Sequence, residues 1–332
     1  MRGDVIETIE AAYRLELPAA EWLRGVGTSF YEQHGAGVGL YGCEYRIVDN
    51  ARMQVGEELR INMPDAAELP MRESMEMMPV DFLRRTFARC DCATQSQYVD
   101  DELRPMVDMA MASLSRYGWR DITAFSGVDP EGHGVYFGAW LPSPKALTPA
   151  MRERWTRVAV HAATALRLRR RLAGEPRPVD RAEAVLTPDG AVEHAVGEAR
   201  VDEARQSLRS AVVHLEEARG RLRASDPDRA VDSWKGLVST RWTLVDQFES
   251  DGKRYVLAHR NEPKLAGLDA LTERERQALA YAALGHTNKL VAYELGVSAS
   301  TVAVLLHRAA RKLGASSREA LLAAYQRLSA KS

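Results

Sequence analysis

Cysteine is scarce in this sequence, and long hydrophobic runs are missing. The 332 residues hold three cysteines, Cys43, Cys90 and Cys92. Such a small, odd number argues against a disulfide scaffold and favours a reducing compartment. No stretch approaches the roughly 18 apolar residues that a membrane span needs, and residues 1–17 are rich in acids, unlike a secretory signal. We therefore predict a cytoplasmic protein without a membrane partner.

The sequence also lacks the common signatures of catalysis and cofactor binding. It has no nucleophile elbow, no P-loop, no His-Glu-x-x-His and no dinucleotide glycine fingerprint. The glycines at 35, 37 and 39 precede a predicted strand and so do not cradle a phosphate. Cys90-x-Cys92 has the wrong spacing for a common zinc pair, and His133 has no partner at ligand spacing. We therefore predict no enzyme, no cofactor and no metal site. The thiols remain open to two interpretations, redox sensing or ordinary burial.

The charge is unevenly distributed, although the net charge is only −1 and the 45% apolar and 27% charged residues are typical of a globular protein. From residue 264 to the end, ten lysines and arginines face five acids, while the other 263 residues hold 35 bases and 41 acids. A basic segment on an acidic body indicates a nucleic-acid partner or, alternatively, a solvated helical surface.

Hydrophobic periodicity predicts an α/β unit over residues 1–173. The expected helices are 4–16, 19–33, 79–89, 103–117 and a long exit helix that begins at Thr148–Pro149 and ends near 172. The expected strands are 38–48, 119–127 and 133–141, with a turn at 129–132.

Two clusters in this unit each leave two interpretations open. The exit helix ends in Arg167, Arg169, Arg170 and Arg171, which are either a second DNA contact or a solvated helix end favoured by the dipole. Seven of the eleven methionines lie between Met71 and Met111, where they either line a ligand pocket or fill a core.

A linker rich in glycine and proline, 174–178, precedes a smaller unit over residues 180–262. We predict a hairpin around 187–190, a helix over 200–223, and two strands, 239–248 and 253–260. The strands are joined at Ser250-Asp251-Gly252, because Asp-Gly between β-branched runs is a hairpin signal.

The last segment, 265–332, predicts four helices with clear start and stop signals. Thr272-x-x-Glu275 is a capping box that opens the first helix. Asn288 to Leu295 is a short second helix, and Ser298-x-x-Thr301 and Ser316-x-x-Glu319 cap the third and fourth. Glycines at 285, 296 and 314 end the first three helices. Two helices joined by a short glycine turn in a basic segment indicate a helix-turn-helix.

These residues resemble the LuxR-type (GerE-like) DNA-binding domain. The matching marks are Leu271-Thr272, Arg274-Glu275, Leu279, Gly285, Asn288-Lys289, Ala292, Leu295-Gly296-Val297-Ser298, Thr301-Val302, Lys312-Leu313-Gly314 and Ser317-Arg318. The resemblance implies a dimerising module of a transcription regulator that binds double-stranded DNA, with RNA polymerase as a further candidate partner.

The third helix has a core stripe and a polar outer face, as a recognition helix requires. The expected DNA-binding residues are Asn288, Lys289, Ser300, Thr301, Val304, His307, Arg308 and Arg311. Val304 either packs against a thymine methyl or completes a local core. The fourth helix presents an apolar set that we assign to a homodimer contact: Ala320, Leu321, Ala324, Tyr325 and Leu328.

Two positions depart from the family. Ala303 stands where a lysine is usual, and Leu305 where a histidine is usual. They motivate an alternative function, a protein-interaction or anti-activator factor whose helix-turn-helix no longer binds DNA usefully.

The remaining chain resembles known modules in pattern. Residues 1–173 are similar to a GAF-type sensory domain, which implies an unidentified small-molecule ligand, and residues 180–262 are loosely similar to a truncated PAS module. The predicted fold class is therefore an α+β multidomain chain with a GAF-like α/β sensor, a small α/β middle unit and an all-α four-helix module.

Overall fold

The structure is a computed structural model that describes residues 4–35, 38–49, 52–173, 178–248, 252–265 and 268–329. It divides into two compact units, Met1–Val128 with Gly132–Leu166, and Asp129–Glu131 with Arg167–Ser332. Most of the predicted linker, one glycine of the predicted glycine-rich segment and the tip of the last predicted hairpin lie outside the described residues. Among the described residues, no single helix has the length and apolar character to cross a membrane, and only the bent pair of helices over 288–312 passes that test jointly.

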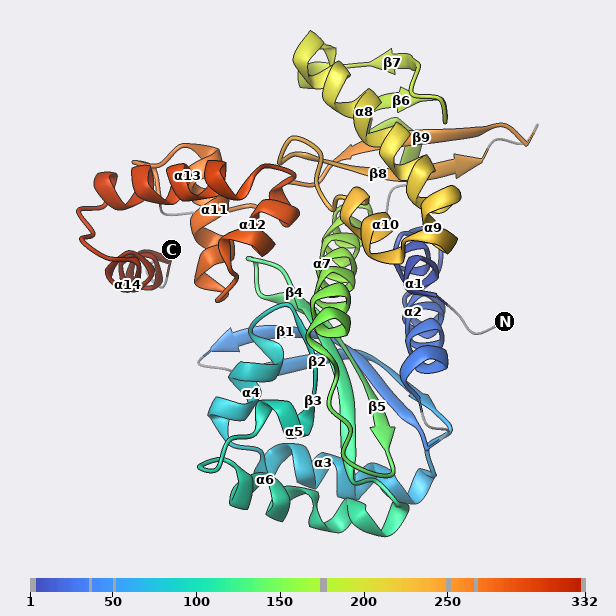
Figure 1. Ribbon diagram of the computed structural model, residues 1–332, viewed down its shortest axis with the longest axis vertical. Helices are drawn as coiled ribbons and strands as arrows, with labels where there is room; N and C mark the ends of the chain where they lie inside the picture. Colours follow the sequence, from blue (N-terminus) through green and yellow to red (C-terminus); the bar gives the residue numbers. More distant parts are fainter. Residues whose placement is uncertain are drawn as a thin grey trace. The chain divides into compact units, whose positions relative to one another are not determined.

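The first unit is built on a five-stranded antiparallel sheet with the order β2-β1-β5-β4-β3 (Figure 1). Its strands are β1 (Leu40–Asp49), β2 (Arg52–Ile61), β3 (Asp91–Thr94), β4 (Asp121–Val128) and β5 (His133–Leu141). All eight residues of β4 are buried, as expected of a strand that is covered on both faces.

Helices cover both faces of this sheet. Its helices are α1 (Val5–Ala12), α2 (Ala19–His34), α3 (Glu68–Met77), α4 (Val80–Phe87), α5 (Gln95–Tyr98), α6 (Arg104–Met111) and α7 (Pro149–Leu172), with 3₁₀ turns η1 (Asp65–Ala67) and η2 (Ala112–Tyr117). On one face, the ring of Phe30 from α2 lies 4.8 Å from that of Phe125 and 5.2 Å from that of Trp155 from α7. On the other, Phe87 from α4 lies 4.8 Å from Tyr136.

Some of these elements carry no clear sequence signal. The sequence analysis predicted neither β2 nor α3, β3 and α5. Strand β2 is an edge strand whose side chains are mostly exposed, with Leu59 buried, so it shows no alternation of apolar and polar residues. The predicted helix over 103–117 is an α-helix only to Met111 and continues as a 3₁₀ turn.

The second unit begins with a four-stranded antiparallel sheet in the order β7-β6-β9-β8. Its strands are β6 (Ala182–Leu186), β7 (Val192–Ala195), β8 (Trp242–Phe248) and β9 (Arg254–Arg260), with the 3₁₀ turns η3 (Pro178–Arg181) and η4 (Gly197–Arg200). In each sheet the first strand along the chain lies between the second strand and the last strand. The second sheet therefore has the same topology as the first, with one strand fewer. Pairing of Phe248 with Arg254 confirms the predicted hairpin.

Three helices accompany this sheet: α8 (Asp202–Arg219), α9 (Arg221–Ser225) and α10 (Pro227–Ser233). Helix α8 buries Leu208, Val212 and Leu215 at helical spacing. The single helix predicted over 200–223 is interrupted at Gly220, which ends α8 and starts α9. Helix α10 was not predicted, and Pro227 occupies its first turn.

The last four helices are α11 (Glu273–Ala283), α12 (Asn288–Leu295), α13 (Ala299–Lys312) and α14 (Arg318–Ser329). They confirm the predicted module. The capping box at Thr272 is formed, and the Thr301 N–H donates to Ser298 Oγ at 3.0 Å. The cap predicted at Ser316 is wrong, because the Ala320 N–H donates to Ser317 Oγ instead (3.1 Å), and α14 therefore starts one residue later.

At Arg167, the end of α7 matches neither of the two interpretations of its arginine cluster, a DNA contact or a solvated helix end. Arg167 is 1% exposed. Its Nε donates to the backbone O (3.0 Å) and Oδ1 (3.2 Å) of Asn261, and its Nη1 donates to the Tyr281 hydroxyl of α11 at 3.3 Å. The solvated interpretation fails for Arg167 because these acceptors replace water around the guanidinium.

Helix α12 is anchored on the part of the unit that precedes the four-helix module. The Tyr293 hydroxyl lies 2.7 Å from the Val231 carbonyl oxygen and 2.8 Å from that of Trp234, at the end of α10. Gly296 has φ +64°, and a Cβ added there would lie 2.5 Å from the Leu237 carbonyl oxygen. The backbone therefore approaches closely at the turn between α12 and α13.

This contact predicts unequal effects of alanine at two left-handed glycines. Gly296→Ala and Gly285→Ala both place a Cβ on a left-handed residue, at a cost of about 1–2 kcal/mol. A Cβ at Gly285 meets nothing within 4 Å, so Gly285→Ala is the matched control. Gly296→Ala should lower the free energy of unfolding in urea by about 1–3 kcal/mol more, because Leu237 must move. Equal losses would show that the anchoring contact contributes nothing to stability.

Candidate nucleic-acid interface

Helix α13 separates a buried side from an exposed side, as a recognition helix must. Val302, Leu305, Leu306 and Ala309 are buried in the core that α11, α12 and α14 share. The predicted DNA-binding residues of this helix are all exposed: Ser300, Thr301, Val304, His307, Arg308 and Arg311. Val304 is 48% exposed, so it does not complete a local core in this chain.

The first turn of α13 is organised by hydroxyl groups. Ser298 Oγ lies 2.8 Å from both Ser300 Oγ and Thr301 Oγ1. The three hydroxyls and the free N–H groups of a helix start present donors on one surface, the arrangement that binds phosphate oxygens.

The two predicted residues of α12 have different surroundings. Lys289 is exposed. Asn288 is half-buried, and its Oδ1 accepts a hydrogen bond from Arg318 Nη1 at 2.8 Å, while Arg318 Nη2 donates to the His286 carbonyl at 3.0 Å. Asn288 therefore ties the start of α12 to the start of α14.

A groove of about 550 Å³ runs beside the recognition helix, and the sequence analysis did not foresee it. Asn288, His307, Arg311 and Arg318 line it with small side chains such as Ala303. Arg318 was quoted as a family mark but was not assigned to the site. Its position at the start of a helix that follows the recognition helix was the available signal.

The two departures from the family pattern occupy different environments. Leu305 is 7% exposed and belongs to the module core, so this substitution removes no exposed polar group from the outer face. Ala303 is exposed and lines the groove. Of the two, only Ala303 leaves the interface without a usual cation.

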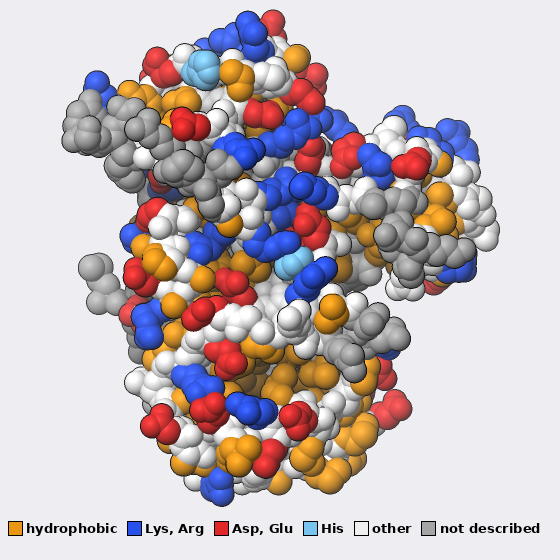
Figure 2. Space-filling model, turned by 180° about the vertical axis from the view of Figure 1, so that it is seen from behind, with side chains coloured by type: hydrophobic (Ala, Val, Ile, Leu, Met, Phe, Trp, Pro, Cys, Tyr) orange, Lys and Arg blue, Asp and Glu red, His pale blue; other side chains and the backbone are white. Residues whose placement is uncertain are grey.

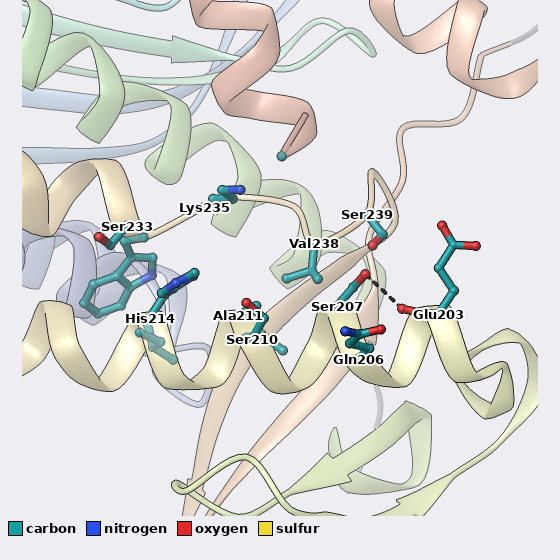
Figure 3. Close-up of a pocket in the computed structure, with 14 residues that line it drawn as sticks. Glu203, Gln206, Ser207, Ser210, Ala211, His214, Ser233, Lys235, Val238 and Ser239 are labelled. Atoms are coloured by element: carbon teal, nitrogen blue, oxygen red, sulfur yellow. Dashed lines mark hydrogen bonds between the residues drawn. The ribbon is translucent and has the colours of Figure 1, made fainter. Parts of the chain in front are cut away.

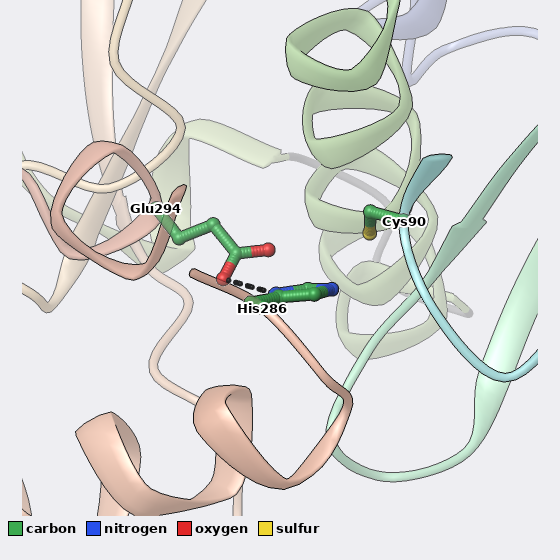
Figure 4. A group of neighbouring side chains, drawn as sticks. All are labelled: Cys90, His286 and Glu294. Carbon is green, nitrogen blue, oxygen red and sulfur yellow. Dashed lines mark hydrogen bonds and ion pairs between the residues drawn. The ribbon is translucent and has the colours of Figure 1, made fainter. Parts of the chain in front are cut away.

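Two side-chain pairs, each with a buried carboxyl group, hold the helices of the module in place. Lys312 Nζ, at the end of α13, lies 2.7 Å from Glu275 Oε2 in α11, and Glu275 is 3% exposed. His286 Nδ1 lies 3.0 Å from Glu294 Oε2 (Figure 4), with both side chains buried. The second pair links the turn before α12 to the end of that helix.

Helix α14 places the five residues of the predicted dimer surface in different environments. Leu321 is 3% exposed and lies in the module core, so its assignment to a dimer contact is wrong. The core of four helices is deep enough to bury it. Tyr325 and Leu328 pack against the same core while partly exposed, and Ala320 and Ala324 are half-buried.

The first unit holds a separate cavity of about 310 Å³ between β1, β2, α3 and α4. Its lining includes Tyr41, Cys43, Tyr45, Met71, Met75 and Phe87. On the face drawn in Figure 2, hydrophobic side chains line a hollow that charged side chains of both signs surround. The predicted methionine cluster therefore contributes to this cavity and to the core, since Met111 is buried while Met106 and Met109 are exposed.

The thiols of the first unit are buried. Burial raises the pKa of Cys43 to about 12 and that of Cys92 well above its usual value. The Cys90 thiol lies 3.4 Å from the Val128 carbonyl oxygen. Because the thiolate is the reactive form, burial makes Cys43 and Cys92 less reactive than exposed thiols, and the redox-sensing interpretation stays a prediction.

A third cavity, of about 370 Å³, lies between α8 and the segment 233–239. Figure 3 shows Glu203, Gln206, Ser207 and His214 along α8 on its border. Ser207 Oγ donates to the backbone O of Glu203 at 2.9 Å. The lining mixes one acid, one lysine and several neutral polar groups, which selects no class of ligand.

Comparison with known families identifies the last module. Residues 269–324 match the family described as "Bacterial regulatory proteins, luxR family". These residues form a LuxR-family helix-turn-helix domain. No curated protein sequence matches the chain. Among solved structures, the crystal structure of Escherichia coli SdiA is similar at 12% identity and a TM-score of 0.35, covering 96% of this chain and 94% of that chain.

The Lys312–Glu275 pair generates a stability prediction. Burial raises the pKa of Glu275, but hydrogen bonds from Lys312 and Thr272 hold it below the usual 4.5. Lys312→Gln should lower the free energy of unfolding at pH 7 by about 1–3 kcal/mol, because a buried carboxylate loses its partner. Because the pKa of Glu275 is lower in the folded state than in the unfolded state, its ionised form stabilises the folded protein at a pH above the unfolded pKa. This contribution is lost as the pH falls. The difference in stability between Lys312→Gln and wild type should therefore shrink below about pH 4.

Denaturant unfolding between pH 3 and pH 7 measures this effect. Arg311→Gln is the matched control, because Arg311 is the exposed neighbour in the same helix and should change stability by less than about 0.5 kcal/mol. A Lys312→Gln difference that stays constant with pH would contradict the role of the carboxylate.

Proposed function

We propose that this protein is a transcription regulator that binds double-stranded DNA through the outer face of α13. The observation that carries the proposal is the exposure of all six predicted α13 residues on a LuxR-family domain. In this proposal, DNA phosphates are contacted by Thr301 and Lys289. Phosphates or base edges are contacted by His307, Arg308 and Arg311. Val304 packs against a thymine methyl. Asn288 acts mainly through Arg318, as a positioning residue.

We infer further that the first unit is the sensor. Its 310 Å³ cavity with aromatic and thioether walls lies in the size range of small-molecule sites, and the antiparallel sheet covered by helices supports the GAF-like assignment. The repeated strand order of the second sheet supports a truncated PAS-like unit. The proposed domains remain 1–173, 180–262 and 265–332.

We propose the location, the oligomeric state and the further partner of the protein by analogy with regulators of the LuxR family. The protein works in the cytoplasm, acts as a homodimer, contacts RNA polymerase when it regulates, and is not an enzyme. The alternative is a protein-interaction or anti-activator factor without useful DNA binding. It is favoured by Ala303, because the first two turns of α13 expose no lysine or arginine before Arg308.

DNA binding by the full chain separates these two functions. A preferred duplex is first selected from random sequences. Fluorescence anisotropy at salt concentrations of about 50–300 mM then gives the slope of log affinity against log salt concentration. Lys289→Ala should weaken binding to all duplexes alike and reduce the slope by about 1. Arg327→Ala, an exposed arginine on α14, is the matched control and should leave it unchanged. A full-length protein without salt-sensitive retention on any duplex establishes the alternative.

The homodimer generates a second prediction. Ala324 is half-buried on α14, and the neighbouring Gln326 is exposed. Ala324→Glu should weaken binding to a two-fold symmetric site at least about tenfold, because a carboxylate is desolvated in the apolar contact. Helicity by circular dichroism should be unchanged. Gln326→Glu adds the same charge outside the contact and should retain wild-type affinity. Unchanged affinity of Ala324→Glu would exclude pairing through this face of α14.

A further inference from the structure

The second unit contains a basic cavity that the proposed DNA interface does not use. Its volume is about 450 Å³. Six cations line it, from the end of α7, the turn before β6, the end of β9 and the segment after it: Arg167, Arg170, Arg171, Arg181, Arg260 and Lys264. Glu131 is the only acid among the described residues of the lining. Figure 2 shows Lys and Arg side chains gathered near the middle of the face that it draws.

Among the described residues, five carboxylates pair with the six cations of this cavity, those of Asp129, Glu131, Glu183, Glu198 and Glu262, so the surplus of positive charge is small. Glu131 lies 3.7 Å from Arg170 and 3.5 Å from Arg171, so one carboxylate is shared by two guanidinium groups. Arg260 is paired with Glu262 and Glu183, and Arg170 lies 3.8 Å from Asp129. Burial lowers the pKa of Arg171, and the charge of Arg167 lowers it further. The cations therefore slightly outnumber the acids at a place where water is partly excluded.

The deepest cation of the cavity retains an unused donor. Arg167 is 1% exposed, and its Nε and Nη1 atoms are engaged by Asn261 and Tyr281. Its Nη2 atom is buried without a hydrogen-bond acceptor among the residues that the structure describes. A buried donor in this state costs free energy unless an acceptor reaches it, and an anion in the cavity supplies one.

We propose that this cavity binds a small metabolite that carries two or more phosphate groups. Guanidinium groups pair with phosphate oxygens through two parallel hydrogen bonds, and several arginines around one concavity suit a chain of phosphates better than a single carboxylate. The volume lies in the range of small-molecule sites. A DNA duplex does not fit the same chemistry, because its backbone cannot reach an arginine buried to this depth.

The position of the cavity connects its occupant to the DNA-binding module. Arg167 donates to Tyr281 of α11, and Lys264 belongs to the segment that leads from β9 to α11. A phosphate that draws on Arg167 and Lys264 therefore acts on the residues that position the start of the module. The ligand is distinct from that of the proposed sensor cavity in the first unit.

Isothermal titration of the full-length chain with inorganic tripolyphosphate and with ATP, both without Mg²⁺, tests the site. Both probes should bind, and sulfate should bind at least about tenfold more weakly, because a single dianion meets fewer of the arginines. Similar affinities for the two probes would assign recognition to the phosphate chain, whereas tighter ATP binding would add a nucleoside contact. Binding is measured without DNA, so failure of the DNA-binding proposal leaves this result unaffected.

Variants locate the binding in the cavity. The double variant Arg181→Ala with Lys264→Glu changes two exposed side chains of the lining and should weaken tripolyphosphate binding at least about tenfold without changing the melting temperature. Arg205→Ala removes an exposed arginine of α8, outside the lining, and should have no effect.

Three results would overturn the proposal. The first is the absence of any heat of binding with either probe at low salt. The second is that Arg205→Ala weakens tripolyphosphate binding as much as the double variant does, which would indicate diffuse charge attraction. The third is loss of duplex affinity in the double variant as large as in Lys289→Ala, together with displacement of tripolyphosphate by duplex DNA. That result would make the cavity a DNA contact.

Discussion

A buried guanidinium is the constraint on which the second unit depends. Arg167 reaches Asn261 and Tyr281 at once, and Asn261 in turn donates to Thr243 Oγ1 at 3.0 Å. The end of α7, the middle sheet and the first helix of the LuxR-family module therefore share one hydrogen-bonded group. A charge at 1% exposure is tolerated only because its acceptors are fixed. Movement of any of these elements leaves a buried donor unsatisfied.

The four-helix module meets the middle part of the unit through α12 and α11 and leaves α13 outward. Tyr293 binds two carbonyls at the end of α10, where the helix presents acceptors without intrahelical partners. Because α12 and α13 share one core, the anchoring of α12 also fixes the direction of the recognition helix. A change in the middle part is therefore transmitted physically to the orientation of α13.

The sequence predicts elements best where the signal is local. Caps and glycine stops located α12 to the residue, and the Thr-Pro start located α7, because a hydroxyl cap or a left-handed glycine acts within a few residues. Strand β2 was missed because an edge strand with exposed side chains carries no periodic pattern. Arg167 was interpreted as a DNA contact or a solvated helix end, and Leu321 as a dimer contact. The groups that bury both side chains come from distant parts of the chain, which a helical pattern cannot reveal.

The excess of basic residues in the last segment overstates the number of cations on the proposed DNA-binding surface. Of the ten bases after residue 263, Lys312 is bound to a buried carboxylate, Arg276 pairs with Glu273, and Arg318 is held by Asn288. Lys264 lines the separate basic cavity. Counterion release depends on cations that reach phosphates, so only part of the surplus serves the recognition surface. The rest positions helices or, in the case of Lys264, lines the basic cavity of the second unit.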